Sequence, residues 1–248
     1  MNSELKATRV DSPLQSFFWS GETLRSRNVS AVVLSGRVAV PALPARLVAD
    51  CEREIDGKVG LAPGDVEALS LARARVRWPA YRQCVQALSD WMYTLALQEV
   101  LAASAPALMA CRSVKYHHDG TRYGGAAFCN LFLSEDCGLD LHFSAIGHRV
   151  PLRRGTAVVF DTGQAHALVE RSSGKLYRAD GDPTPAQTQL FLSWELPIEH
   201  AEVRRALQLA FDVDPLTASR LDQAQVWLNG APASVCRESG QWLGSGGG

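Results

Sequence analysis

The stretch "HRVPLRRGTAVVFDTGQAHALVE", residues 148–170, decides the fold class of this chain. It contains three short apolar runs, 148–152, 156–161 and 166–170, and a Gly-containing turn lies between each run and the next. Runs of about four to eight residues that are rich in Val, Leu and Phe and bounded by turn residues are typical of β-strands. The stretch therefore predicts successive strands joined by short turns.

Four more runs of the same texture lie on either side of this stretch. They cover residues 108–117, 126–135, 139–144 and 188–196. Together, seven such runs in about ninety residues predict an antiparallel all-β barrel or sandwich. We expect a jelly-roll core over residues 107–197.

Helical spacing is found outside this core. Apolar residues recur at three- and four-residue intervals in four segments, 45–55, 80–105, 199–211 and 216–228. Residues 29–40 are rich in Val and broken by Ser-Gly, which predicts a strand or a strand pair near the start of the chain. The expected fold class is therefore α+β, with α-helices around a jelly-roll core.

The length of the chain favours a single domain over residues 1–248. We expect residues 1–106 to be mainly helical support with an early strand region, and residues 107–197 to be the jelly-roll core. Residues 198–248 are expected to form C-terminal helices and a flexible tail, because the chain ends in "GSGGG".

The amino-acid composition argues against several kinds of partner and site. A formal net charge of -1 and a hydrophobic content of 46% give no basic surface, so neither a nucleic acid nor an acidic membrane surface is expected as a partner. The six cysteines form no Cys-x-x-Cys pair, which argues against a zinc knuckle or a redox pair. No apolar run has the length of a membrane span, and residues 1–21 lack the apolar stretch of a signal peptide. We therefore expect a cytoplasmic protein.

The segment "KYHHDGTRYGG", residues 115–125, carries candidate metal ligands. Residues i and i+2 of a strand point to the same face, so His117 and Asp119 would present an imidazole and a carboxylate side by side. His118 would point the other way. Taken alone, this pattern is also compatible with a solvated loop.

A third candidate ligand, His166, opens the strand expected at 166–170. Two neutral imidazoles and one carboxylate on one face of a metal are the ligand set that binds Fe(II) and leaves positions open for a cosubstrate and dioxygen. His117, Asp119 and His166 are therefore predicted to be the metal ligands.

The region from about residue 111 to residue 196 resembles the double-stranded β-helix core of the 2-oxoglutarate-dependent Fe(II) oxygenases, the prolyl-hydroxylase-like family. The resemblance lies in the order and spacing of "HHD", "CGLDLHF", "PLRRGTAVVF" and "QAHAL". It implies that the three ligands are the catalytic residues, with Fe(II) and 2-oxoglutarate as cofactors and dioxygen as the second substrate. Succinate and CO2 would be released while a small molecule or an amino-acid-type substrate is hydroxylated. Because halogenating relatives have Gly or Ala at the carboxylate position, Asp119 favours hydroxylation, desaturation or ring formation over halogenation.

The sequence departs from this family where the far carboxylate of 2-oxoglutarate is anchored. Family members place Arg or Lys about ten residues after the distal His, at the start of the last core strand, whereas the strand at 188–196 contains no basic residue. A guanidinium suits this role because it holds a carboxylate with two charge-assisted hydrogen bonds. The candidates for cosubstrate binding are Arg178 first, Lys115 second, because it shares strand parity with His117, and Arg171 third.

Two alternatives stay open at this point. The missing basic residue favours a cupin-like metal oxygenase or isomerase that uses the same three ligands without 2-oxoglutarate. A protein of a different class, a non-catalytic β-helix domain that binds a ligand or a partner, would carry the same strand pattern with a vestigial metal site.

Overall fold

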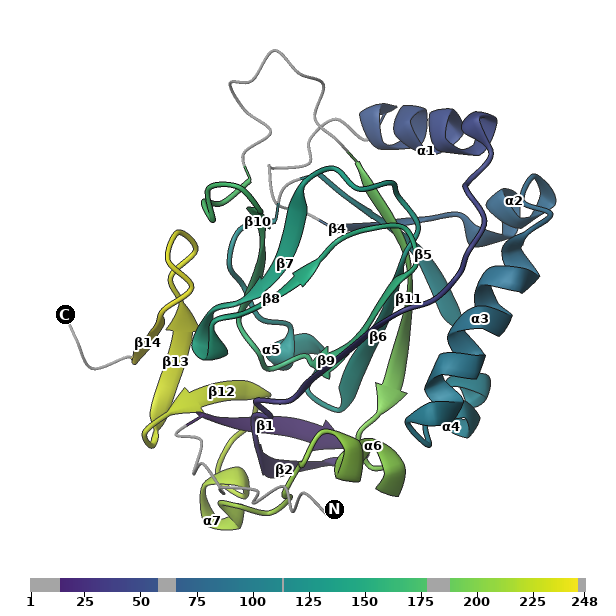
Figure 1. Ribbon diagram of the computed structural model, residues 1–248. Coiled ribbons are helices and arrows are strands. Elements are labelled where there is room, and N and C mark those ends of the chain that lie inside the picture. Colours follow the sequence, from purple (N-terminus) through teal and green to yellow (C-terminus); the bar gives the residue numbers. More distant parts are fainter. Residues whose placement is uncertain (1–13, 58–65, 113, 178–187, 245–248) are drawn as a thin grey trace, which may run out of the picture.

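The computed structural model describes residues 14–57, 66–112, 114–177 and 188–244. The chain forms a mixed α/β structure in which large antiparallel sheets lie at the centre and the helices between residues 45 and 103 lie along one side (Figure 1). The sheets hold six, three and five strands.

The six-stranded sheet is antiparallel throughout and has the order β3-β9-β6-β11-β5-β4. Its strands in that order are β3 (Val33–Arg37), β9 (Thr156–Asp161), β6 (Ala126–Phe132), β11 (Gln189–Pro197), β5 (Pro106–Cys111) and β4 (Val66–Leu69). The three-stranded sheet has the order β10-β7-β8, with β10 (His166–Glu170), β7 (Leu139–Phe143) and β8 (His148–Pro151). All seven apolar runs singled out in the sequence therefore contain a strand, β5 to β11.

These two sheets bury a shared apolar layer. Alternate residues of each strand point into it, as the pleat of a strand requires. The six-stranded sheet contributes residues such as Phe132, Val158 and Phe191, and the three-stranded sheet contributes residues such as Leu141 and Leu168. This packing holds the two sheets face to face.

The helices α1 (Ala45–Gly57), α2 (Leu71–Val76), α3 (Tyr81–Thr94) and α4 (Gln98–Ala103) lie beside the six-stranded sheet (Figure 1). Leu88 and Met92 of α3 belong to the same buried cluster as Leu192 and Trp194 of β11, so the helices cover the outer face of this sheet. The prediction of a single helix over residues 80–105 is wrong in one respect. It divides into α3 and α4 at Ala96, whose φ of 58° is left-handed and ends a helix. Among the described residues, no helix is long and apolar enough to cross a membrane.

The five-stranded sheet joins the two ends of the described chain, in the order β14-β13-β12-β1-β2. Its members are β14 (Trp242–Gly244), β13 (Ala231–Val235), β12 (Gln225–Leu228), β1 (Leu14–Ser20) and β2 (Thr23–Asn28). The prediction of C-terminal helices over residues 198–248 is therefore largely wrong. Only α6 (Ala201–Ala206) and the short α7 (Pro215–Ala218) are helical there.

The reason lies in tertiary pairing and in an overlooked turn. Residues 225–228 pair with β1, and Val226 is buried against Leu14 and Val29. Asn229 and Gly230 both have positive φ, 52° and 80°, which is the conformation of a tight hairpin turn. The Asn-Gly pair was a hairpin signal, and it outweighs the helical spacing of residues 216–228.

Candidate metal centre

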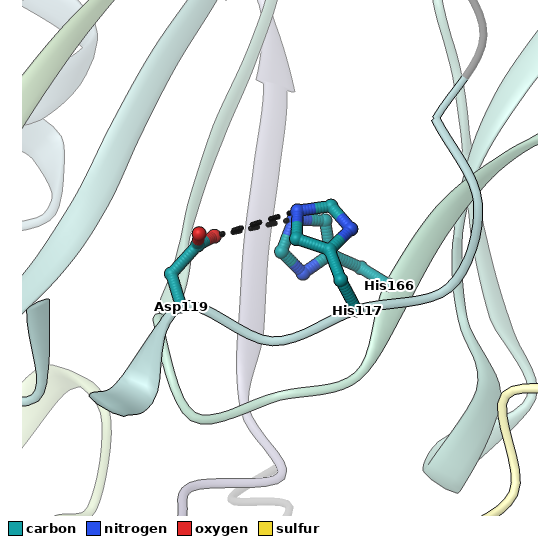
Figure 2. A group of neighbouring side chains, drawn as sticks. All are labelled: His117, Asp119 and His166. Atoms are coloured by element: carbon teal, nitrogen blue, oxygen red, sulfur yellow. Dashed lines mark ion pairs between the residues drawn. The ribbon is translucent and has the colours of Figure 1, made fainter. Parts of the chain in front are cut away.

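His117, Asp119 and His166 are brought together by backbone hydrogen bonds between two chain segments. His117 N–H donates to the carbonyl of His166 at 3.2 Å, and His166 N–H donates to the carbonyl of His117 at 2.9 Å. Asp119 N–H donates to the carbonyl of Thr162 at 2.8 Å, in the turn just before β10. The segment 117–119 is thus paired with the start of β10, and the three side chains converge (Figure 2).

The ligand atoms of these three residues are close enough to share an ion. The Nε2 atoms of His117 and His166 each lie 3.7 Å from Oδ2 of Asp119, and one ligand atom from each residue lies within 4.8 Å of the other two. Ligand atoms bound at about 2.0–2.2 Å from one ion are separated by roughly 3 Å when adjacent. Small side-chain movements therefore convert this group into a metal site.

Both imidazoles are oriented so that Nε2 is free. Nδ1 of His117 lies 2.9 Å from the carbonyl of Lys115, and Nδ1 of His166 lies 3.0 Å from the carbonyl of Gln164. A carbonyl oxygen only accepts, so each Nδ1 carries the hydrogen and donates it. In the neutral ring the lone pair then lies on Nε2, as in metal-binding histidines whose other nitrogen is held by a carbonyl.

Asp119 directly precedes the short helix α5 (Gly120–Tyr123), and its side chain makes no capping hydrogen bond to that helix. An Asp in this position commonly accepts a hydrogen bond from the first turn. Here the carboxylate turns toward the two imidazoles instead, and is available to a cation (Figure 2).

The electrostatics of the three residues favour an incoming cation. Burial, with a smaller contribution from His117, lowers the pKa of His166 to about 3, so this imidazole is neutral and able to ligate. Burial raises the pKa of Asp119, while His117 and Arg122 oppose that rise. A bound cation would favour the charged carboxylate and offset the cost of its burial. The side chains of His117, Asp119 and His166 are 33%, 25% and 9% exposed, so the site opens on the side of the first two.

His118 lies apart from the three ligands. Its ring packs against Trp242 of β14, with ring centroids 5.0 Å apart, and burial lowers its pKa to about 4. His118 is therefore a half-buried contact between the segment 117–119 and the five-stranded sheet.

Aromatic side chains surround the metal-facing side of the site. The ring of Phe160 lies 5.0 Å from that of His166, and the ring of Phe143 lies 6.1 Å from it. Phe128 lies 5.9 Å from Phe160 and 5.2 Å from Tyr123. Since Phe128 and Tyr123 are only half-buried, these two rings form the open side of the aromatic wall.

One buried polar side chain that sequence reasoning missed, Asn130, lies beside this aromatic wall. Asn130 shares the inner face of β6 with Phe128 and Phe132, and it is paired across the sheet with Ser193. Oδ1 of Asn130 is buried and has no hydrogen-bond partner among the described residues. A polar residue inside the apolar run "AAFCNLFLSE" was the available signal.

The candidate cosubstrate anchors Lys115 and Arg171 are both ion-paired. Nζ of Lys115 lies 2.7 Å from Oε1 of Glu238. Arg171 pairs through Nε with Oδ1 of Asp140 at 2.7 Å and through Nη1 with Oδ2 of Asp136 at 3.0 Å. The structure thus gives each of these cations a carboxylate partner outside the metal cluster.

The first-choice anchor, Arg178, lies outside the described residues. At the start of β11 stands Gln189, which is 1% exposed. Neither amide atom of Gln189 has a hydrogen-bond partner within the described structure. Next to it on the inner face, the ring of Phe191 packs against that of Phe132 at a centroid distance of 5.2 Å and an interplanar angle of 30°. The inner face of β11 at this end is therefore neutral and mostly apolar.

No protein-family model and no curated protein matches the chain significantly. Structural neighbours include prolyl-4-hydroxylases and 2-oxoglutarate-dependent enzymes. A Pseudomonas putida prolyl-4-hydroxylase is 19% identical over 66% of this chain and 92% of that chain, with a TM-score of 0.37. AviO1 from Streptomyces viridochromogenes is 17% identical over 68% and 90%, with a TM-score of 0.38. The epimerase SnoN, in complex with Fe3+ and alpha ketoglutarate, is 16% identical over 66% and 78%, with a TM-score of 0.36. At these scores the likeness is partial, and the chemistry of the site rests on its own side chains.

Proposed function

We propose that this protein is a non-haem Fe(II), 2-oxoglutarate-dependent dioxygenase that hydroxylates a small-molecule or amino-acid-type substrate. One observation carries the proposal: Nε2 of His117 and Nε2 of His166 each lie 3.7 Å from one carboxylate oxygen of Asp119, in a half-open site. This donor set suits Fe(II) and leaves one face of the ion for other ligands. In this proposal His117, Asp119 and His166 are the iron ligands and the catalytic residues.

We further propose that the two facing sheets are a double-stranded β-helix, the jelly roll expected from the sequence. Four core strands, β5, β11, β6 and β9, are neighbours in one sheet, and β10, β7 and β8 are neighbours in the other. The bridge between His117 and His166 adds the 117–119 segment beside β10. This gives each side four chain segments, with the iron ligands on two that are adjacent.

The protein's own part in the reaction is to supply the iron ligands, to orient the substrate and to exclude water from the site. When bound, Fe(II) together with 2-oxoglutarate and dioxygen supplies the oxidising power, and succinate and CO2 are released. The carbonyls of Lys115 and Gln164 hold the two imidazoles in the ligating tautomer. Phe143 and Phe160 keep the His166 side of the site dry.

The open side of the site supports a small or amino-acid-type substrate. Tyr123 and Phe128 offer half-buried rings, and the guanidinium of Arg122 lies 5.1 Å from the ring centre of Tyr123. Aromatic faces with one nearby cation suit a substrate that carries an apolar part and an anionic group. The near-neutral net charge of -1 gives no support to a nucleic-acid substrate.

For the cosubstrate anchor we retain Arg178 as the first candidate and Lys115 as the second. A buried carboxylate needs a cation or several donors, because an uncompensated charge in an apolar environment is costly. Lys115 would have to leave Glu238 to serve, which makes Arg178 the better candidate. The unpartnered amide of Gln189 is a further donor at the start of β11.

A second candidate function is a cupin-like metal oxygenase or isomerase that does not use 2-oxoglutarate. The specific observation in its favour is the inner face of β11, where Gln189 is neutral and Phe191 stacks on Phe132. This candidate uses the same three metal ligands.

The test is an anaerobic titration of the protein with Fe(II), followed by addition of 2-oxoglutarate. We expect one ion per chain and then the weak visible charge-transfer band of a bidentate 2-oxo acid, both of which His166→Ala should lack. Iron without the band would support the cupin-like alternative. No iron would contradict both candidates and favour a non-catalytic domain.

A further inference from the structure

A fully buried ion pair, Arg27 with Asp161, lies behind the candidate metal centre. Nη1 of Arg27 is 2.6 Å from Oδ2 of Asp161, and Nη2 is 2.7 Å from Oδ1, so the pair is bidentate. Both side chains are 0% exposed. Arg27 belongs to β2 of the five-stranded sheet, whereas Asp161 ends β9 of the six-stranded sheet, so the pair joins two sheets.

The hydrogen bonds of this pair are nearly complete. Oδ2 of Asp161 also accepts from Ser30 N–H at 2.7 Å, and Oδ1 accepts from Gly163 N–H at 2.8 Å. Arg27 also donates through Nη1 to the carbonyl of Asn28 at 3.0 Å. The carboxylate therefore has four donors, which a buried charge requires.

On one side the network leads to His166. Gly163 N–H donates to the side chain of Asp161, and Gln164 N–H donates to its carbonyl at 2.9 Å. The carbonyl of the same Gln164 accepts from Nδ1 of His166 at 3.0 Å. Asp161 thus shapes the turn whose carbonyl sets the tautomer and ring orientation of His166.

On the other side the network leads to Asp119. Nε of Arg27 donates to the carbonyl of Gly124 at 3.0 Å, directly after the helix that Asp119 precedes. The hydroxyl of Thr162, next to Asp161, donates to the carbonyl of Tyr123 at 2.9 Å, and the carbonyl of Thr162 accepts from Asp119 N–H at 2.8 Å. One guanidinium therefore holds both segments that carry metal ligands.

Stability alone is a poor explanation for such a pair. Taking two charges out of water is costly, and apolar side chains of similar volume are often equally or more stabilising. What an apolar pair cannot supply is directional hydrogen bonding to two separate loops. A preorganised metal site needs such support, because its ligands must be held close to their bound geometry.

We propose that Arg27 and Asp161 are positioning residues for the metal centre. The hairpin of β1 and β2, which carries Arg27, is then part of that site. The pair fixes the spacing between Asp119 and His166 before the ion arrives. This inference rests on the proposed metal site, and it does not depend on which reaction that site performs.

The test replaces both partners, Arg27→Met with Asp161→Asn, so that no unpaired charge stays buried and the protein can fold. The matched control is Arg25→Met with Asp212→Asn. Arg25 lies on the same strand and is also bidentate to its partner, at 3.0 and 2.6 Å, but this pair is 32% and 50% exposed. Co(II) and Fe(II) affinities are measured anaerobically for the full chain, well below the thermal midpoint of each variant, and the visible Co(II) spectrum is recorded.

We expect the Arg27/Asp161 variant to bind both metals about 10- to 100-fold more weakly, as for other supports of metal ligands, and to change the Co(II) spectrum. The Arg25/Asp212 variant should match the wild type in both. A lower melting temperature with unchanged metal affinity and spectrum would show a merely structural role and overturn the inference. A wild type that binds neither metal would overturn the metal site itself, and the inference with it.

Discussion

The two ends of β11 face very different surroundings. At its C-terminal end, Glu195 pairs with Phe128, whose ring is part of the aromatic wall beside His166. At its N-terminal end lie the buried neutral amide of Gln189 and the stacked ring of Phe191. One end borders the aromatic wall that leads to His166, and the other has apolar packing with an unpartnered amide.

This difference shows which part of the proposed chemistry follows from the pairing of strands. The metal end is set by reciprocal backbone hydrogen bonds between His117 and His166, so its ligands follow from strand pairing. At the other end, where a cosubstrate carboxylate would need a cation, the first residues of β11 are uncharged, and the guanidinium of Arg112 donates to Thr188 and pairs with Asp56. The metal and the cosubstrate should therefore respond independently to substitution.

The largest effect is expected at the metal end. His117→Ala, Asp119→Ala and His166→Ala should each abolish metal binding, because each removes one of three ligands. His118→Ala is the control and should keep most of the binding, since His118 packs against Trp242. Metal content of the folded proteins, measured after anaerobic loading, checks this. Loss of metal in His118→Ala beside retention in His117→Ala would show that the ligand register is shifted by one residue.

The next largest effect is expected at the opposite end of β11. Phe191→Ala removes a buried ring that stacks on Phe132, which should lower the free energy of unfolding by about 3–5 kcal/mol. The affinity for Fe(II) should stay unchanged in the folded variant. Urea unfolding and metal titration measure the two quantities. Weaker metal binding in the folded variant would mean that the two ends are coupled.

A smaller effect is expected on the cosubstrate. Arg178→Ala, or Lys115→Ala if that residue leaves Glu238, should remove a charge-assisted hydrogen bond of about 1.5–3 kcal/mol. The apparent affinity for 2-oxoglutarate should then fall about 10- to 100-fold, with metal content unchanged.

The measurement is succinate formation against 2-oxoglutarate concentration, and Arg171→Ala, the third candidate, is measured next, although Asp140 and Asp136 already bind its guanidinium. Wild-type dependence in both Arg178→Ala and Lys115→Ala would place the anchor elsewhere. A wild type that makes no succinate would favour the cupin-like alternative.

The smallest effect concerns the hairpin that joins β12 to β13. Gly230 has a φ of 80°, so Gly230→Ala should cost about 1–2 kcal/mol of stability. Metal affinity should not change. Thermal unfolding of the variant checks the first expectation, and an unchanged melting temperature would mean that the turn is not formed as described.

Short-range sequence patterns were sufficient to predict the strands of the core. Each of the apolar runs in residues 107–197 contains a strand, because alternation and turn residues act locally. The grouping of His117, Asp119 and His166 could be predicted because their spacing and the position of His166 at a strand start are also local features, although residues 118 and 119 do not form a strand. The hairpin turn at Asn229 and Gly230 could have been predicted in the same way, but the pairing of β12 with β1 could not, since it joins parts of the chain about two hundred residues apart.

The residues proposed to position the metal site could not be predicted from the sequence either. No sequence pattern distinguishes Arg27 or Asp161, and only the fold brings them together. The prediction of one helix through Ala96 was wrong for a related reason. The spacing of apolar residues around Ala96 does not indicate that this residue has a left-handed φ.

The central claim is that His117, Asp119 and His166 hold one metal ion. The most direct measurement is an anomalous difference map at the iron edge, from crystals grown anaerobically with Fe(II). We predict one peak per chain, within bonding distance of Nε2 of both histidines and of a carboxylate oxygen of Asp119. A peak bound by other residues, or no peak at full iron loading, would contradict the account.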